Sequence, residues 1–194
     1  MTTIQLCIPL DDPRYKVKLI YLGKQGPNKP SPLSYLQSIR SGVLAAASGN
    51  KPEETTIAMA YHNKLDEYTA RLASEVPVPN MAIFSPPSRF THALPYREAM
   101  INIWPDIVDL TSRFKRDEKY PSGQNATSDE IFNNLQYEAT GYESSFTTVL
   151  VVDDIFSRGR TVAAAIEKLR QAGVGDDCDF TVACPLWVDR GANA

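Results

Sequence analysis

One stretch, TTVLVVDDIFSRGRTVAAAIEKL from Thr147 to Leu169, constrains the fold of this chain more than any other. Thr148 to Val152 is β-branched and apolar without polar alternation, which is typical of a strand covered on both faces. A polar loop follows, and the Ala-rich segment from Val162 to Ala172 then predicts a helix that stops at Gly173. A strand, a loop and a helix in this order predict an α/β unit whose loop lies at the carboxyl end of a parallel sheet, where such sheets bind ligands.

The residue types of this loop divide it into two halves. Asp153 and Asp154 suit hydroxyl groups or a hydrated Mg²⁺, because a carboxylate repels a phosphate. In the second half, Gly159 permits a tight turn, while consecutive amides and the helix N-terminus favour an anion. Hydroxyls and positive charge are added there by Ser157, Arg158, Arg160 and Thr161. We therefore expect a ligand with a phosphate at one end and a diol at the other, such as a ribose 5-phosphate. The alternative is an ordinary strand-to-helix turn whose Asp residues cap a helix.

The string VVDDIFSRGRT resembles the phosphoribosyl diphosphate (PRPP) binding motif of type I phosphoribosyltransferases. Its Gly-Arg-Thr ending is similar to that of the pyrimidine attenuator/uracil phosphoribosyltransferase family. The resemblance implies that Asp153 and Asp154 contact the ribose hydroxyls and that residues 157–161 bind the 5-phosphate. The chain departs from the family at Arg158, where a small hydroxyl residue is usual. The amide of Arg158 can still serve, whereas its bulk can alter the pocket.

A second strand–loop–helix unit precedes this one. Met81 to Phe84 predicts a strand and Leu94 to Ile103 predicts a helix, and the string IFSPPSRFTHALPYREAM resembles the layout of ComF-like phosphoribosyltransferases. If both strands belong to one parallel sheet, the two loops open at the same edge. The resemblance implies a diphosphate-binding loop, in which the proline pair donates no amides. A plain proline-rich connection fits the same residues. The candidates for the diphosphate are Ser85, Ser88 and Arg89, with Arg97 as a further one.

Ile107 to Phe114 fits a strand or a helix, and the polar stretch from Lys115 to Asn125 predicts a mobile loop. Thr127 to Glu130 is a capping box at the start of a short helix. In the family a flexible loop closes over the active site, and the resemblance gives this role to Lys115, Arg116 and Lys119. A solvated charged loop fits these residues equally well. The chain lacks the Arg that ComF-like members carry in this region, which leaves open whether catalysis is retained.

Asp179 to Leu186 predicts the last strand, and Trp187 follows it. In the family, residues after this strand can line the base pocket. Trp187 therefore has two interpretations: a platform that stacks on a nucleobase, or an aromatic of the core or of an interface. Near the N-terminus, Val17 to Leu22 predicts a strand, and Leu33 to Ala47 predicts a helix by its apolar spacing.

Composition narrows the class of protein. The 194 residues suit a single domain with a sizeable core. The formal charge of −3, from 20 basic and 23 acidic residues, argues against a general attraction to nucleic acid or to anionic membranes. Three scattered cysteines favour a reducing, cytoplasmic setting rather than a disulfide framework or a metal cluster. The chain has no apolar run long enough to span a bilayer and no signal-peptide pattern.

The resemblance implies a type I phosphoribosyltransferase-like α/β fold, with a parallel β-sheet flanked by helices. Residues 1–55 are expected to form a small N-terminal hood or extension, and residues 56–188 the core. The expected activity is transfer of the phosphoribosyl group of PRPP to a nitrogen acceptor, a nucleobase or ammonia, with release of diphosphate. Mg²⁺ is expected to arrive with PRPP near Asp153 and Asp154, without a metal site held by the protein alone. A homodimer is implied by the family. The alternatives are a non-catalytic sensor that binds PRPP or a nucleotide, and an interaction subunit without a working site.

Overall fold

The computed structural model describes residues 2–25, 70–76, 79–87, 94–116, 126–153 and 155–188. Several sequence-based predictions fall outside these ranges. They are the N-terminal helix at 33–47 and the site candidates Asp154, Ser88, Arg89 and Lys119.

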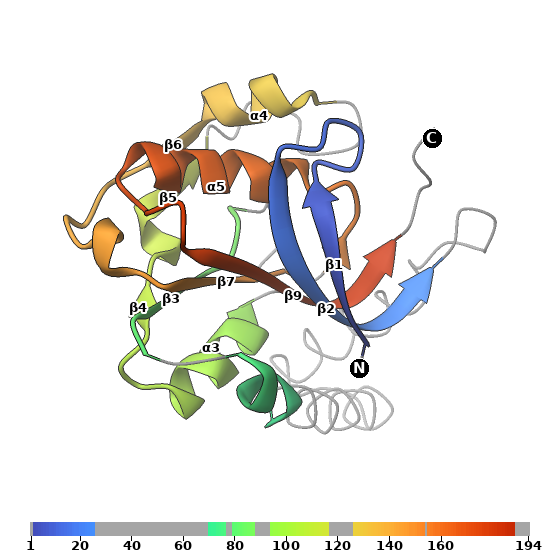
Figure 1. Ribbon diagram of the computed structural model, residues 1–194, viewed down its shortest axis with the longest axis vertical. Helices are drawn as coiled ribbons and strands as arrows, with labels where there is room; N and C mark the ends of the chain where they lie inside the picture. The colour runs from blue at the N-terminus through green and yellow to red at the C-terminus, as the bar shows by residue number, and fades with distance from the viewer. Residues whose placement is uncertain are drawn as a thin grey trace, which may run out of the picture.

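A mixed sheet of mostly parallel strands forms the centre of the molecule (Figure 1). Its strand order is β1-β2-β9-β7-β3-β4, and the short strand β8 pairs with β9. Among the described strands of this sheet, only β1 and β2 run antiparallel to each other; the other pairs are parallel. The strands are β1 (Thr2–Ile8), β2 (Tyr15–Gln25), β3 (Met81–Phe84), β4 (Val108–Asp109), β7 (Thr148–Val152), β8 (Ile155–Phe156) and β9 (Asp179–Val188). The expected α/β class is thereby confirmed.

Helices cover both faces of this sheet. The helices α4 (Ser128–Asn134) and α5 (Arg160–Gln171) lie on one face, and α3 (Leu94–Ile103) lies on the other with helical residues 70–75 (Figure 1). Within β7, Val149 and Val151 join the buried cluster on the α5 side, whereas Leu150 and Val152 join the cluster on the α3 side. Burial on both faces explains why this strand is apolar throughout.

The ends of α4 and α5 follow the predicted signals. At the end of α5, Gly173 has a φ of 108°, and its amide donates to Arg170 O over 3.0 Å. The Val174 amide donates to Leu169 O over 3.0 Å, which completes a Schellman motif. At the start of α4, the predicted capping box is confirmed by reciprocal hydrogen bonds between Thr127 and Glu130.

The described N-terminal residues extend the main sheet. β1 and β2 form an antiparallel hairpin, and β2 then pairs in parallel with β9. The predicted strand at Val17 to Leu22 is therefore real but longer, and the preceding segment supplies its partner.

The segment from Ile107 to Arg116 is made of several short elements in succession. It contains β4, a 3-10 turn at Thr111–Arg113 and β5 (Phe114–Arg116), which pairs with β6 (Leu135–Tyr137) in a second, antiparallel sheet. The prediction of a loop is wrong for Lys115 and Arg116. The buried ring of Phe114 lies 4.6 Å, centroid to centroid, from the rings of Phe84 and Tyr137, and this packing keeps the strand extended.

A second 3-10 turn, Glu143–Ser145, precedes β7. Across the described ranges, none of the helices has the length and apolar character needed to cross a membrane.

Candidate functional site

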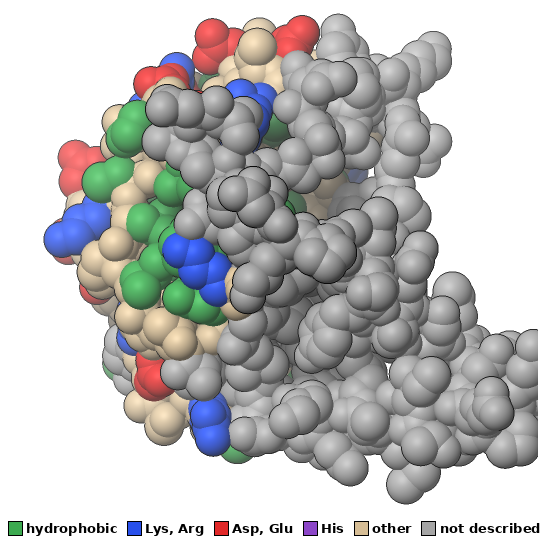
Figure 2. All heavy atoms as spheres, turned by 90° about the vertical axis from the view of Figure 1, so that its right-hand side faces the viewer, with side chains coloured by type: hydrophobic (Ala, Val, Ile, Leu, Met, Phe, Trp, Pro, Cys, Tyr) green, Lys and Arg blue, Asp and Glu red, His purple; other side chains and the backbone are tan. Residues whose placement is uncertain are grey.

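Two polar loops meet at the carboxyl edge of the sheet. Phe84 in β3 pairs in parallel with Val151 in β7, so the loops that begin at Ser85 and Asp153 open side by side. This confirms the expectation that both loops lie at one edge of a parallel sheet. Figure 2 shows the molecule from the side towards which β2 and β9 run, where Lys and Arg side chains lie among hydrophobic ones.

A pocket of about 150 Å³ lies at the carboxyl end of β7. Its walls come from Asp153, residues 155–162 and Ile131 of α4. The Asp153 amide donates to Ala183 O over 3.0 Å, which keeps the chain aligned with β9 just beyond the end of β7. The pocket therefore brings together six predicted site residues, namely Asp153, Ser157, Arg158, Gly159, Arg160 and Thr161.

Gly159 is the turning point of the loop. It has a φ of 77°, in the left-handed region, and occupies the N-cap position of α5. A Cβ placed here would lie 2.9 Å from Ile8 Cγ2 and 3.0 Å from Phe156 Cζ. Only glycine suits both the backbone angle and the close approach. Glycine has no side chain that could cap the helix. The amides in the first turn of α5 therefore receive no hydrogen bond acceptor from the N-cap residue.

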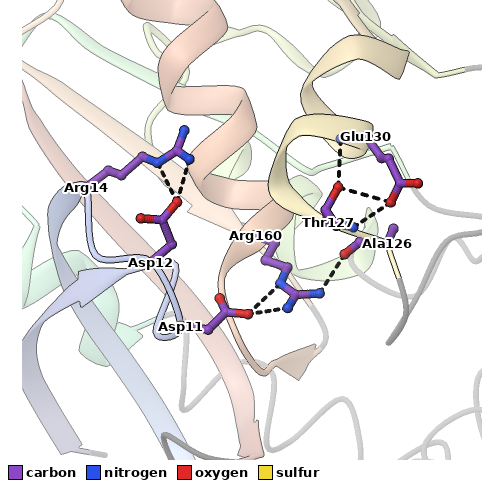
Figure 3. A network of polar contacts seen from close by, with 7 residues as sticks. All are labelled: Asp11, Asp12, Arg14, Ala126, Thr127, Glu130 and Arg160. Carbon is purple, nitrogen blue, oxygen red and sulfur yellow. Dashed lines mark hydrogen bonds and ion pairs between the residues drawn. The ribbon is translucent and has the colours of Figure 1, made fainter.

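The Arg160 side chain points towards Asp11 and the backbone carbonyl of Ala126 (Figure 3). Its Nε donates to Asp11 Oδ2 over 2.9 Å, its Nη2 donates to the same oxygen, and its Nη1 donates to Ala126 O over 2.6 Å. Arg160 thus joins the turn between β1 and β2 to the residue just before the α4 cap. The hydrogen bond from Arg160 lowers the pKa of the Asp11 carboxyl, with a smaller contribution from the charge of Arg158.

No sequence pattern pointed to Asp11 as a residue of the site. Asp11 and Asp12 are polar residues in a short turn, and such residues are common there for local reasons. Only the folded hairpin brings Asp11 to Arg160, which lies in the distant motif.

Arg158 also contacts the hairpin, through its backbone. Its carbonyl accepts a hydrogen bond from the Leu10 amide over 2.9 Å. Its side chain is half-buried and lines the pocket, as do the half-buried Ser157 and Thr161. The loop is thus fixed from behind by the hairpin while these side chains remain at the pocket wall.

The loop after β3 agrees only in part with the prediction of a diphosphate-binding loop. The Ser85 amide donates to Thr111 Oγ1 over 3.1 Å, so it is not available to a diphosphate. The buried Ser85 hydroxyl has no hydrogen-bond partner in the structure. The same is true of the buried Arg97 Nε, which lies 3.8 Å from Asp109 Oδ2, beyond hydrogen-bond reach. Both groups are thus buried without a hydrogen bond, although Arg97 keeps its ion pair with Asp109.

Three other predictions can be placed. Trp187 belongs to the buried core: the Tyr21 ring meets it edge-on with centroids 5.2 Å apart, and Lys24 Nζ lies 3.9 Å from the centroid of its ring. The core interpretation therefore holds, and the ring is not open for stacking on a base. Lys115 is exposed, with its Nζ 3.7 Å from Glu138 Oε2, and neither Lys115 nor Arg116 lines the pocket.

Among the described residues, no three His, Cys, Asp or Glu side chains come together in a way that could hold a metal ion. Comparison with known proteins gave no match to a family model and no match to a curated protein.

Proposed function

We propose that this chain is a phosphoribosyltransferase-like protein, which binds PRPP with Mg²⁺ and transfers its phosphoribosyl group to a nitrogen acceptor with release of diphosphate. The observation that carries the proposal is one pocket, at the carboxyl end of the parallel strand β7, that is lined by both halves of the loop. Asp153 lies at one end of its lining segment, and the glycine turn that begins α5 lies at the other. A carboxylate for hydroxyls and a helix N-terminus for an anion match the two ends of a ribose 5-phosphate.

The 5-phosphate would bind at the first turn of α5. The amides of this turn and the hydroxyls of Ser157 and Thr161 provide donors, and the Arg158 side chain adds positive charge. Asp153 would accept hydrogen bonds from the ribose hydroxyls. Its negative charge would also stabilise the positive charge that develops on the ribose ring as the bond to diphosphate breaks.

The diphosphate would lie beside the end of β3. The Ser85 hydroxyl and Arg97 Nε, both without a hydrogen-bond partner, support this position because buried polar groups are normally paired. A Mg²⁺ ion held by one or two carboxylates and by substrate oxygens fits Asp153 better than a cage made by the protein alone. The ion would neutralise the leaving diphosphate.

The reaction needs little chemistry from side chains. The bond between the anomeric carbon and the diphosphate oxygen breaks, and the acceptor nitrogen forms a new bond to that carbon and loses a proton. Holding the two reactants in line, with charges placed in advance, is the main contribution of such a site.

A second candidate is a sensor that binds PRPP or a nucleotide without turnover. The observation that favours it is the bond from the Ser85 amide to Thr111 Oγ1, followed by two prolines that have no N–H to donate. Within the described residues, the loop after β3 therefore offers the diphosphate no backbone donor.

Calorimetric titration with PRPP, with and without Mg²⁺, tests the proposal. We expect Mg²⁺-dependent binding that the Asp153→Asn variant weakens by about tenfold or more, since one hydrogen bond to a charged group is worth about 1.5–3 kcal/mol. Asp106→Asn, which removes an exposed carboxylate outside the pocket, is the matched control. Unchanged affinity in a folded Asp153→Asn/Asp154→Asn double variant would refute the site.

Turnover separates the two candidates. An enzyme releases diphosphate when PRPP and a suitable nucleobase or ammonia are both present. A sensor binds PRPP with the same dependence on Asp153 and releases none.

A further inference from the structure

The hairpin between β1 and β2 lies directly against the proposed phosphate loop. The Leu10 amide donates to Arg158 O over 2.9 Å, and Ile8 Cγ2 would lie 2.9 Å from a Cβ at Gly159. These contacts place Asp11, the next residue of the turn, beside the start of α5. The position of Asp11 is therefore supported by a backbone hydrogen bond from the preceding residue and by the packing of Ile8.

Asp11 is an ionised carboxylate in the field of two arginines. Its Oδ2 accepts hydrogen bonds from both Nε and Nη2 of Arg160. The pair is partly shielded, with 19% of the Arg160 side chain and 30% of the Asp11 side chain exposed. The hydrogen bond from Arg160 lowers the pKa of Asp11, and the charge of Arg158 adds to the effect. Asp11 therefore carries its full negative charge at neutral pH.

Arg160 borders two hollows. It lines the pocket that holds Asp153 and the phosphate loop. It also lines a neighbouring hollow of about 200 Å³ that contains the carboxylates of Asp11, Asp12 and Asp129. Asp12 and Asp129 are both ion-paired with Arg14, whereas Asp11 is paired with Arg160. Among the described carboxylates of this hollow, Asp11 is thus the one that forms its ion pair with Arg160, a residue of the proposed phosphate loop.

From these contacts we infer that Asp11 is an internal counter-anion that determines how strongly, and how selectively, the loop binds a phosphate. This inference rests on the proposed function, because it concerns the same loop. The phosphate of a ligand and the carboxylate of Asp11 compete for the positive charge of Arg160 and Arg158. The repulsion from Asp11 therefore lowers the affinity of the loop for an anion. An uncharged sugar does not feel this repulsion, so the effect of Asp11 is confined to anionic ligands such as a phosphate.

The sign of the effect distinguishes this role from a structural one. If Asp11 only positioned Arg160, its loss would weaken phosphate binding. If Asp11 competes with the phosphate, neutralising it strengthens binding. Asp11→Asn keeps the size of the side chain and one oxygen acceptor for Arg160, so the hairpin contact is retained while the charge is removed.

The test is titration of the full chain with ribose 5-phosphate, inorganic phosphate and, for comparison, uncharged ribose. We expect Asp11→Asn to bind the two phosphates about three- to fivefold more tightly than wild type, as for the loss of one partly screened charge. The gain should shrink as salt is added, and ribose binding should not change. Asp11→Glu, which restores the charge, should return the phosphate affinity to the wild-type value.

Asp12→Asn is the matched control, because it makes the same change one residue further along the same turn and its recorded ion pair is to Arg14. Equal tightening in Asp12→Asn would mean that general charge, not the Asp11 pair, sets the affinity, and would overturn the inference. Weaker binding in Asp11→Asn would also overturn it and would make Asp11 a positioning residue. If Asp11→Asn fails to fold, Asp11→Ser offers a smaller hydroxyl acceptor and takes its place.

The outcome also separates this inference from the proposed function. Phosphate binding that depends on Asp153 but is the same in wild type and Asp11→Asn leaves the proposed function standing and overturns the inference. Phosphate binding that appears only in Asp11→Asn supports the inference. Absence of phosphate binding in all variants overturns both.

Discussion

Gly159 lies so close to Ile8 that a Cβ on the glycine would be 2.9 Å from Ile8 Cγ2 and 3.0 Å from Ile8 Cβ. The loop and the N-terminal hairpin therefore meet without space for a side chain. This contact sets the position of the first turn of α5 relative to β1. A substitution of either residue should change both the stability of the protein and the geometry of the pocket.

We expect Gly159→Ala to destabilise the protein by about 2–5 kcal/mol, because left-handed backbone strain of about 1–2 kcal/mol adds to overpacking of about 1–3 kcal/mol. It should also weaken phosphate binding, since the strain is relieved only by moving the loop. Urea unfolding and titration with ribose 5-phosphate measure the two effects.

Gly141→Ala is the control for this variant. Gly141 has a φ of 87°, similar to that of Gly159, but a Cβ there would meet nothing within 4 Å. It should show the backbone strain without the crowding, and no effect on binding. Equal losses of stability in the two variants would contradict the role given to Ile8.

Glu143 is a buried carboxylate whose hydrogen bonds decide its charge. Burial raises its pKa, but donors outweigh this: the Thr140 amide at 2.6 Å, the Tyr137 hydroxyl at 2.8 Å and the Thr140 hydroxyl at 3.0 Å. The net result is a pKa of about 2. Because this lies below the ordinary value of 4.5, the stabilisation is complete above about pH 4.5 and is lost as the pH falls towards 2.

We predict that Glu143→Gln lowers the free energy of unfolding at neutral pH by about 1–3 kcal/mol. The Gly141 N–H donates to Glu143 Oε2, and the glutamine side chain would place an NH₂ donor where this oxygen accepts. The variant should also lose less stability than wild type on acidification across this range. Chemical denaturation at a series of pH values measures both effects. Glu138→Gln, an exposed carboxylate paired with Arg113, should change stability by no more than about 0.5 kcal/mol. A wild type and a Glu143→Gln variant with the same acid dependence would show that Glu143 is not the titrating group.

The three cysteines should differ sharply in reactivity. Cys7 is exposed, whereas Cys178 and Cys184 are buried. Burial raises the pKa of the Cys178 thiol to about 11, so almost none of the reactive thiolate is present at neutral pH. We expect iodoacetamide to label one thiol of the native protein rapidly and all three after denaturation, as read by intact mass. The Cys7→Ser variant should show no rapid label. Rapid native labelling of that variant would contradict the burial of the other two thiols.

Local patterns were enough to predict the central elements. The apolar run of β7, the Gly173 stop and the Thr127 capping box each depend on neighbours within a few residues, and all three are present. The pocket-lining residues of the loop were found for the same reason, because they follow one strand and precede one helix.

Features that depend on distant partners were not predictable. The engagement of Arg160 with Asp11 and of the Ser85 amide with Thr111 joins segments whose contact exists only in the folded chain. The two interpretations of Trp187 could be separated only by the positions of Tyr21 and Lys24. Lys115 and Arg116 form a strand because β6 pairs with them, which polar sequence alone does not indicate.

The pairing of β2 with β9 has a consequence for synthesis of the protein. These strands come from opposite ends of the described sequence, so β2 cannot take its place in the sheet until the ribosome has released β9. The hairpin that carries Asp11 therefore docks after the strand, loop and helix around Asp153 have been made. A nascent chain that lacks β9 would be without the strand that joins the hairpin to β7, and the sheet around the pocket would be complete only when β9 is in place.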